Sequence, residues 1–264
     1  MTARFTSVIS PEKMNSNQNN ILIVFDAAGC THVSMVTATE LAAAMQAGLQ
    51  ALYIEDNDLL NAVELPFTRE VSLYTAAISH IDSSVMLQKF RSDAESIKKQ
   101  IEEVAVTSRV SFSYSSMRGH KTQIIKNRTA EVNMVLIPAV YSGKGRRQDH
   151  LSRREVVVVY ETNNTANDKA LNIALSHAVK KNQRLVVILG DAHSRKHVES
   201  LTSAYNSNTV IQIANLSHVE EAILLLYRHA PALLVFAQDS ELVSDEKLLL
   251  RLINSLETDL LLVA

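Results

Sequence analysis

Nine short apolar runs alternate with helical stretches along most of this 264-residue chain. The runs are rich in valine, isoleucine and leucine, as in "ILIVFD", "EVVVVY" and "DLLLVA". The segments between them are too long for hairpins and have helical periodicity, so the pattern predicts parallel strands joined by right-handed helical crossovers. Near-continuous apolar strands are typical of a sheet that helices cover on both faces. The sequence therefore predicts an α/β fold.

The strand and helix plan of the first part of the chain recurs in the second part. The predicted strands lie at 21–26, 49–56, 110–116 and 134–139, and again at 155–161, 184–190, 209–214, 232–237 and 259–264. A period of roughly 130 residues indicates a duplicated domain rather than a solenoid. We expect a flexible tail (1–19), a first Rossmann-like domain (20–139), a linker (140–154) and a second Rossmann-like domain (155–264). Because the linker is short, the first domain is predicted to lack its last helix and strand.

The longest predicted helix spans 84–106 and carries one apolar stripe. The stripe recurs at spacings of three and four and consists of Leu87, Phe90, Ala94, Ile97, Ile101 and Val104. This spacing predicts packing on the sheet, although a short coiled-coil seam would give it too. Other helices are expected at 32–48, 121–132 and 247–256. A further helix is predicted to begin at a cap at Asn167, and another to begin at a capping box of Ser217 and Glu220. One more helix is expected to carry Val198, Leu201 and Tyr205.

Composition excludes several classes of protein. The net charge is −2, from 26 basic and 28 acidic residues, which creates no overall field for nucleic acid or an anionic membrane. The single cysteine, Cys30, cannot form an internal disulfide, which fits a reducing compartment. The first twenty residues contain no signal-peptide core, and no later run reaches the ~20 apolar residues of a membrane span. We expect a cytoplasmic protein without nucleic-acid or membrane partners.

Three features resemble the universal stress protein family in a tandem arrangement: a first strand that ends in Asp26, a long second helix, and a closing "LLLVA" strand. The stretches "YIEDNDLL" and "LPFTREV" are similar to a segment that bacterial members carry after strand two. The resemblance covers 20–264 and implies a role in stress response. In members that hold ATP, it also implies that Asp26 and the backbone of Ile54 contact the adenosine.

The phosphate loop that the family uses, G-x2-G-x9-G-S/T, is poorly matched. In this chain one residue separates Gly143 from Gly145, no third glycine follows, and Ser152 comes after a leucine. In the second domain the matching stretch, "QDSELVSDEK", has no glycine and four acidic residues, and Glu161 is the nearest acid to the strand-one aspartate. We therefore expect a degenerate member without a cofactor. The alternative is an ATP site of altered geometry that uses Asp26, Ile54, Gly143, Gly145 and Ser152.

A basic cluster lies in the predicted linker: Lys144, Arg146, Arg147, Arg153 and Arg154. It could meet an acidic partner, RNA or phospholipid headgroups, but base stacking would need more aromatic residues than Tyr141. We interpret the segment as a solvated connector that does not bind ATP with useful affinity.

Two other groups could carry chemistry. His193 and His197 lie four residues apart on a predicted helix after Asp191, which could present two imidazoles to a metal. No further ligand has a readable spacing, so we expect no metal there. Cys30 lies at a predicted helix N-terminus, where a thiol can become reactive, but a thiol in such a turn is most often a small packed side chain, and we interpret Cys30 in that way. No catalytic residue is predicted.

The sequence leads to a non-enzymatic universal-stress-like protein that acts by binding an unknown partner in stress response or regulation. The rival hypotheses are an ATP-binding universal stress protein and an enzyme with a nucleotidyl-type Rossmann-like fold. A homodimer could form through the strand at Leu260–Ala264, because a short apolar edge strand presents unpaired backbone groups to a second copy. The alternative is that this edge is buried against the first half of the same chain.

Overall fold

The computed structural model describes residues 20–71, 75–76, 78–139, 155–203, 205, 208–214, 216 and 219–264. The predicted tail (1–19) and the predicted linker (140–154), with Gly143, Gly145 and Ser152, lie outside these residues. Ser217 of the predicted capping box lies outside them too.

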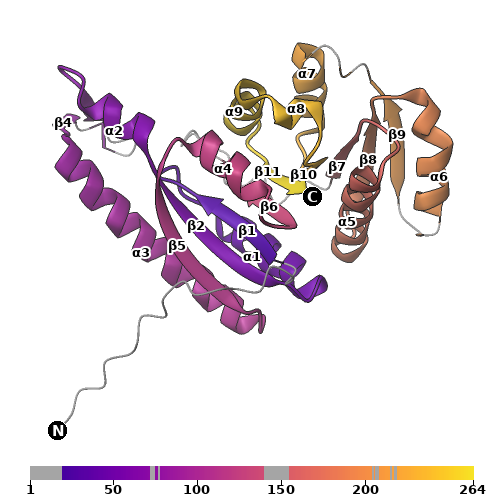
Figure 1. Cartoon of the computed structure of the whole chain (residues 1–264), viewed down its shortest axis with the longest axis horizontal. Helices are drawn as coiled ribbons and strands as arrows, with labels where there is room; N and C mark the ends of the chain where they lie inside the picture. The colour runs from indigo at the N-terminus through magenta and orange to yellow at the C-terminus, as the bar shows by residue number, and fades with distance from the viewer. Residues whose placement is uncertain are drawn as a thin grey trace, which may run out of the picture.

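In its described residues, the first half of the chain supplies four strands of the main sheet and a small hairpin. Its elements are β1 (Asn20–Phe25), α1 (His32–Ala44), β2 (Gly48–Asp56), α2 (Asn57–Val63), β3 (Arg69–Val71), β4 (Ile78–His80), α3 (Ser83–Thr107), β5 (Phe112–Gly119), α4 (Lys121–Thr129) and β6 (Met134–Ile137). The hairpin of β3 and β4 and helix α2 project from the body of the molecule (Figure 1), and Phe67 beside the hairpin is exposed.

The described part of the second half supplies five strands. Its elements are β7 (Glu155–Tyr160), α5 (Thr165–Lys181), β8 (Arg184–Leu189), the 3-10 turn η2 (Ala192–Ser194), α6 (Arg195–Ser203), β9 (Thr209–Ile213), α7 (Val219–His229), β10 (Leu233–Ala237), α8 (Glu241–Ser244), α9 (Glu246–Ser255) and β11 (Asp259–Val263).

The nine main strands form one sheet in the order β5-β2-β1-β6-β11-β10-β7-β8-β9. Every neighbouring pair is parallel except β6 and β11, which are antiparallel. By order along the chain, the first half has the arrangement 3-2-1-4 and the second half has 3-2-1-4-5. The predicted α/β fold with parallel strands and helical crossovers is confirmed, with both parallel parts joined in one continuous sheet. The division into two domains stays a prediction.

Strand β11 lies in the middle of the sheet (Figure 1). It pairs with β10 on one side, where Leu261 lies opposite Val235, and with β6 on the other, where Leu261 lies opposite Leu136. Both of its edges are therefore hydrogen-bonded within the chain. The expectation of a homodimer through Leu260–Ala264 is wrong for this strand, and the alternative, burial against the first half, is confirmed.

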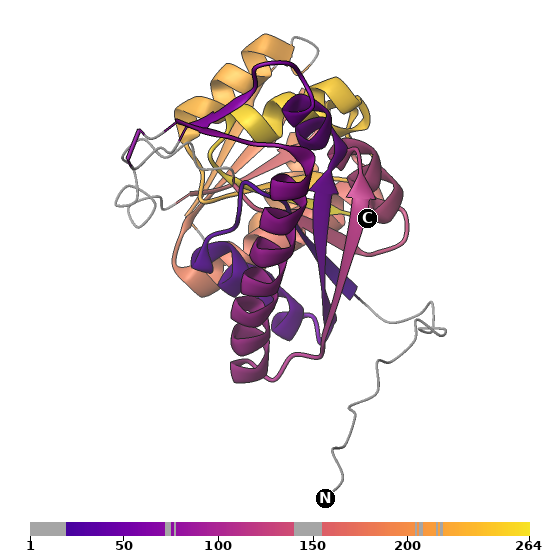
Figure 2. The same ribbon diagram turned by 90° about the vertical axis from the view of Figure 1, so that its left-hand side faces the viewer.

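Helices cover both faces of the sheet, which is why its strands are apolar on both sides (Figure 2). One face packs against α1, α3, α5 and α6 through side chains such as Met35, Phe90, Leu171 and Val198. The other face packs against α4, α7, α8 and α9 through side chains such as Ile125. Strands β5 and β9 are left as the two ends of the sheet.

Helix α3 packs on the sheet, as its stripe predicts. Phe90, Ile97 and Ile101 are buried, and the helix contacts α1, β2 and β5. Other details differ from the expectations. The cap of α5 is Asn164 rather than Asn167, since the Asn164 side chain accepts a hydrogen bond from the backbone N–H of Asn167.

Tyr205 lies beyond the end of α6 rather than on it. Within the described residues, no helix is both long and apolar enough to cross a membrane.

Candidate functional site

Asp26 follows β1 at the carboxyl end of the sheet, where its carboxylate is held by two contacts. One carboxylate oxygen, Oδ2, lies 2.5 Å from Nζ of Lys121, at the start of α4, and the other accepts a hydrogen bond from the Ala28 N–H at 2.9 Å. Both charged side chains are nearly buried, with 12% of the Asp26 side chain and 11% of the Lys121 side chain exposed. The carboxylate that the resemblance assigns to adenosine is therefore neutralised by the chain itself.

Ile54 lies near the carboxyl end of β2, beside β1. The register pairs Phe25 with Tyr53, so Asp26 and Ile54 occupy neighbouring positions at the ends of adjacent strands. The Ile54 side chain is fully buried. These two predicted residues are brought together, whereas Gly143, Gly145 and Ser152 lie outside the described residues and cannot be placed beside them.

A buried carboxylate from the second half reaches the N-terminus of α1. Asp259 begins β11, and its Oδ1 accepts hydrogen bonds from Ser34 Oγ at 2.7 Å and from the Ala139 N–H at 3.0 Å. Ser34 is in the first turn of α1, which Thr31 caps. Asp259 is 5% exposed. The N-terminus of a helix attracts negative charge, so the carboxylate lies where the helix dipole favours it.

The position of Asp259 matters because of the strand order. The crossover from β1 to β2 uses α1 on one face, and the crossover from β5 to β6 uses α4 on the other face. The crevice between the ends of β1 and β6 is thus the topological switch point of the first half, the usual ligand site of open α/β sheets. Asp259 occupies that crevice.

The corresponding crevice of the second half lies between the ends of β7 and β10. Glu161, after β7, accepts hydrogen bonds from Ser240 Oγ at 2.5 Å and from the Glu241 N–H at 3.0 Å. Beside it, Asn164 Nδ2 donates to Asp239 Oδ2 at 3.1 Å. The loop after β10, which corresponds to the phosphate loop of the resembled family, is therefore tied to the loop after β7 by the chain's own acidic side chains.

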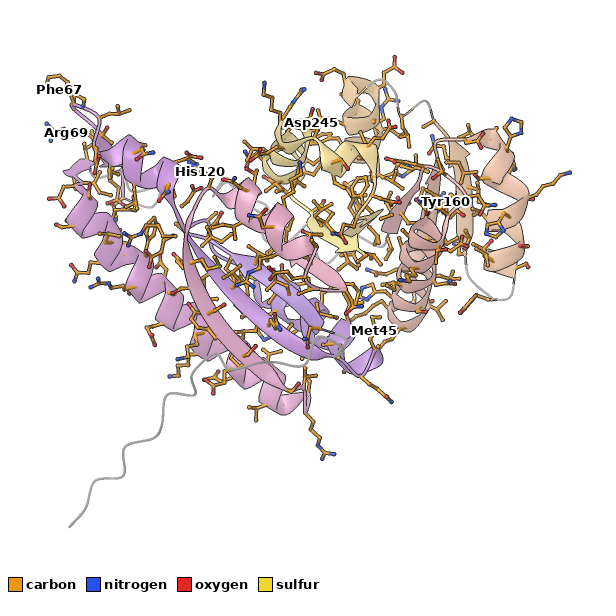
Figure 3. The ribbon with its side chains drawn as sticks, viewed as in Figure 1. Met45, Phe67, Arg69, His120, Tyr160 and Asp245 are labelled. Atoms are coloured by element: carbon orange, nitrogen blue, oxygen red, sulfur yellow. The ribbon has the colours of Figure 1, made fainter. Side chains whose placement is uncertain are left out.

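A third polar cluster joins β7, α5 and α6. Tyr160, labelled in Figure 3, donates a hydrogen bond from its hydroxyl to Asp168 Oδ1 at 2.7 Å, and Nε2 of His197 lies 3.0 Å from the same oxygen. Burial and the bond to Asp168 raise the pKa of the Tyr160 hydroxyl. A phenol with a raised pKa stays protonated and donates, so the cluster serves to fasten the two helices to the strand.

The structure separates the two histidines that sequence spacing placed on one helix. His193 lies in the turn η2 and is exposed, whereas His197 lies in α6 and contacts Asp168. No group of three or more His, Cys, Asp or Glu side chains that could hold a metal occurs among the residues that the structure describes. The expectation of no metal at His193 and His197 stays a prediction.

Cys30 precedes the α1 cap in a protein environment that disfavours the thiolate. Burial, followed by the nearby charge of Asp259, raises the pKa of the Cys30 thiol. Its Sγ lies 3.2 Å from the Thr31 carbonyl oxygen. A thiol in this position is a poor nucleophile, which favours the interpretation of Cys30 as a packed side chain.

Sequence reasoning missed Lys121 and Asp259. The sequence predicts Lys121 at the start of a helix, and in the structure it meets Asp26 across 95 positions of sequence. The sequence predicts Asp259 as the polar beginning of the last strand. The one available signal was its position, because an acidic residue at the head of a buried apolar strand needs a donor nearby.

Comparisons with known proteins give matches only among solved structures. No family model matches the chain, and no curated protein matches it. A universal stress protein from Archaeoglobus fulgidus DSM 4304 aligns with a TM-score of 0.48 at 11% identity, over 93% of this chain and 96% of that one. A protein from Pseudomonas aeruginosa UCBPP-PA14 assigned to the same family aligns with a TM-score of 0.44 at 15% identity, over 94% of each chain. The fold assignment rests on the strand order and burial described above.

Proposed function

We propose that this chain is a universal-stress-like protein that acts by binding, without catalysis, in stress response or regulation, and that standard ATP binding has been lost. The proposal rests on the sequence resemblance and on the side chains that occupy the two crevices at the carboxyl ends of the strands. Both crevices hold carboxylates of the chain itself.

The observation that carries the proposal is the contact of Asp259 with Ser34 and Ala139 in the first crevice. A phosphate at this helix N-terminus would need the same donors. It would also lie next to the carboxylate, and two like charges 4 Å apart repel by about 4 kcal/mol at the effective dielectric constant of a protein surface. The backbone of Asp259 is held at the start of β11, where it pairs with Leu233 near the centre of the sheet.

The second crevice supports the same proposal. Glu161 takes the Glu241 N–H and the Ser240 hydroxyl, two donors of the loop that would have to face a phosphate. Asp239 and Glu241 lie in this loop and add negative charge. A triphosphate would therefore find its donors taken and its charge repelled in this half too.

Titration calorimetry with Mg-ATP at physiological salt tests the proposal. We expect no binding heat for the full chain up to about 1 mM nucleotide, since the donors are occupied. We also expect no adenine absorbance in the supernatant of the purified protein after denaturation.

Two variants define the control. Asp26→Ala removes the residue that the ATP hypothesis requires, and Glu102→Ala changes an exposed carboxylate on α3 that contacts neither crevice. Micromolar ATP binding that is kept by Glu102→Ala and lost in Asp26→Ala would contradict the proposal and support the ATP-binding alternative.

A further inference from the structure

A lobe projects from the body of the molecule and consists of α2, the loop 64–68 and the hairpin of β3 and β4 (Figure 1). Large apolar side chains are exposed on it: Leu65 (63%), Phe67 (94%), Val71 (54%) and Ile78 (69%). Figure 3 labels Phe67 and Arg69 at the far end of the lobe. Single exposed apolar residues are ordinary, but several on one projecting element mark an interaction site. We call these four apolar residues, with Arg69, the lobe surface.

The hairpin turns different side chains toward its two faces. Side chains alternate between the faces of a strand, and directly paired residues share a face. Glu70 of β3 pairs with Lys89 of α3, so its face of the hairpin lies against that helix. Val71 and Ile78 are opposite each other in the register, and they lie with Arg69 on the other face. The apolar pair and the arginine therefore point away from α3.

The carboxylates beside the lobe surface are tied to α3, whereas its cation is available. Besides Glu70, which pairs with Lys89, Glu64 accepts a hydrogen bond from Ser83 Oγ at 3.0 Å. Arg69 is exposed and forms no ion pair within the part of the chain that the structure describes. The whole chain has a net charge of −2 and creates no overall attraction for an anion. The lobe surface offers a local attraction, because its accessible charge is positive.

The loop that carries Phe67 pairs most of its own backbone groups. The Leu65 N–H donates to the Ala62 carbonyl oxygen at 3.3 Å, and the Thr68 N–H donates to the Leu65 carbonyl oxygen at 3.3 Å. Pro66 has no N–H, and the Thr68 hydroxyl also donates to the Ala62 carbonyl oxygen, at 2.9 Å. These bonds hold Phe67 at a φ of 68°, in the left-handed region that bulky residues rarely adopt. A loop with few unpaired donors enters apolar surroundings at little cost.

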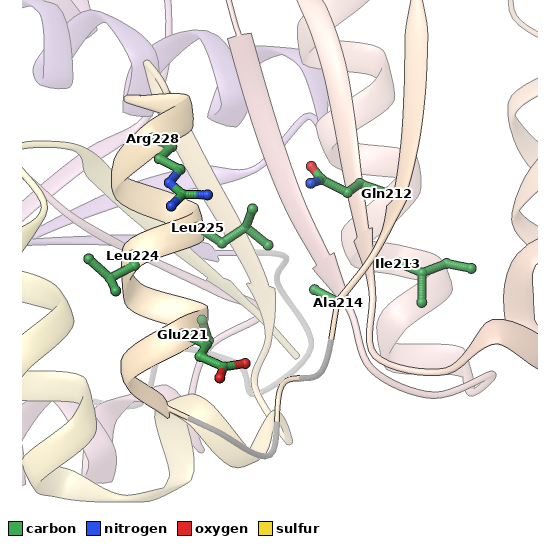
Figure 4. Close-up of a pocket in the computed structure, with 8 residues that line it drawn as sticks. Gln212, Ile213, Ala214, Glu221, Leu224, Leu225 and Arg228 are labelled. Carbon is green, nitrogen blue, oxygen red and sulfur yellow. The ribbon is translucent and has the colours of Figure 1, made fainter.

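We propose that the lobe surface binds an anionic lipid surface reversibly. A projecting face cannot enclose a small ligand, unlike the hollow of about 330 Å³ between α7 and β9 at one end of the sheet (Figure 4). A lipid interface takes up apolar side chains without a matching shape, and its headgroup charge attracts Arg69. The contact is weak and readily reversed, because stable anchoring needs more apolar area or more charge than the lobe surface has.

A partner protein with an apolar pocket is the alternative occupant. Its pocket would have to match side chains that are spread over a loop and two strands, whereas acyl chains adapt to any arrangement. The lipid contact differs from the expectation of no membrane partner, which rests on the charge of the whole chain. It does not depend on whether ATP binding has been lost, so the two proposals can fail separately.

A tryptophan probe tests the contact directly. The chain contains no tryptophan, so the fluorescence of Phe67→Trp reports only on the surroundings of that position. With vesicles of phosphatidylcholine and about 25% phosphatidylglycerol, we expect its emission to move to shorter wavelength and brominated acyl chains to quench it. Val106→Trp is the matched control, because Val106 is 69% exposed at the other end of α3. Its emission should not change.

Cosedimentation with the same vesicles measures the strength of the contact. Phe67→Ala should lower the partition coefficient at least about tenfold, because it removes the most exposed apolar side chain of the lobe surface. The full chain should prefer these vesicles to pure phosphatidylcholine by about fivefold, and Arg69→Glu should abolish the preference. Lys99→Glu makes the same change of charge at an exposed position of α3 and should keep the preference.

The proposal is overturned by a full chain that stays in the supernatant with both kinds of vesicle, as a partner protein with an apolar pocket would predict. It is overturned equally if Phe67→Ala binds as well as the wild type, or if the emission of Phe67→Trp does not change. An equal loss of preference in Lys99→Glu and Arg69→Glu would show that the attraction does not belong to the lobe surface. Urea midpoints equal to that of the wild type confirm that the variants are folded.

Discussion

His177 on α5 is expected to make the protein less stable in mild acid. The residue is 7% exposed and lies near Lys181, which pairs with Glu40 on α1 at 2.6 Å. Burial, followed by the charge of Lys181, lowers the pKa of His177 from 6.5 to about 4. The folded state therefore holds a neutral imidazole at a pH where the unfolded state already binds a proton.

The size of the effect follows from the two pKa values. Between pH 6.5 and pH 4 the unfolded chain binds more protons at His177 than the folded chain, so the free energy of unfolding falls as the pH falls. As far as His177 is concerned, the free energy of unfolding has its full value above pH 6.5 and falls progressively down to about pH 4. From pH 8 to pH 5, His177 alone is expected to remove about 2 kcal/mol.

Urea denaturation at pH 8 and pH 5 measures this change. His177→Gln removes the titrating group, so its stability difference between the two pH values should be smaller than that of the wild type by about 2 kcal/mol. His32→Gln, at an exposed histidine, should leave the difference within about 0.5 kcal/mol of the wild type. If His177→Gln keeps the full wild-type pH dependence, or if an NMR titration gives the His177 ring a pKa near 6.5, the reasoning is refuted.

Three further measurements test the residues at the carboxyl ends of the strands. Lys121→Met leaves the nearly buried Asp26 carboxylate without its cation and should lower the free energy of unfolding by about 3 kcal/mol. The double variant Lys121→Met with Asp26→Leu should recover most of this loss, because it removes the unpaired charge. Equal losses in the single and double variants would contradict this. Asp259→Ala removes the acceptor of two hydrogen bonds and should cost about 2–4 kcal/mol in urea denaturation, whereas a loss under 1 kcal/mol would show that the carboxylate is not needed there. Cys30 should react with a disulfide reagent at pH 8 at least about tenfold more slowly in the folded than in the unfolded chain, because its pKa is raised, and equal rates would refute the burial of the thiol.

The sheet and its covering helices could be predicted because local pattern decides them. The run Val156–Tyr160 is buried on both sides, as its unbroken apolar sequence indicates. Phe90 and Ile101 are buried because the stripe of α3 matches the helical period. In contrast, the hairpin of β3 and β4 has strands of three residues each, too short for a pattern with period two to be recognised.

The contacts that fill the candidate site could not be predicted, because they join residues far apart in sequence. Ser34 and Asp259 are separated by 225 positions, and no local feature relates a serine in the first turn of a helix to an aspartate at the head of a distant strand. The antiparallel pairing of β6 with β11 is equally non-local, since both strands read as ordinary buried strands of a parallel sheet. Only the acidic loop after β10 was recognisable from composition, and its contact with Glu161 was not.

The filled crevice of the first half has a structural cause in the pairing of β6 with β11. Strand β6 is buried on both faces, and without a neighbour on one side it would be an apolar edge strand open to aggregation. β11 covers that edge while it completes the second half as its fifth strand. Because the pairing is antiparallel, the first residue of β11 meets the carboxyl end of β6, which brings Asp259 to the N-terminus of α1. A change that detaches β11 from β6 is therefore expected to expose the edge of β6 and to free the donors of the first crevice in the same step.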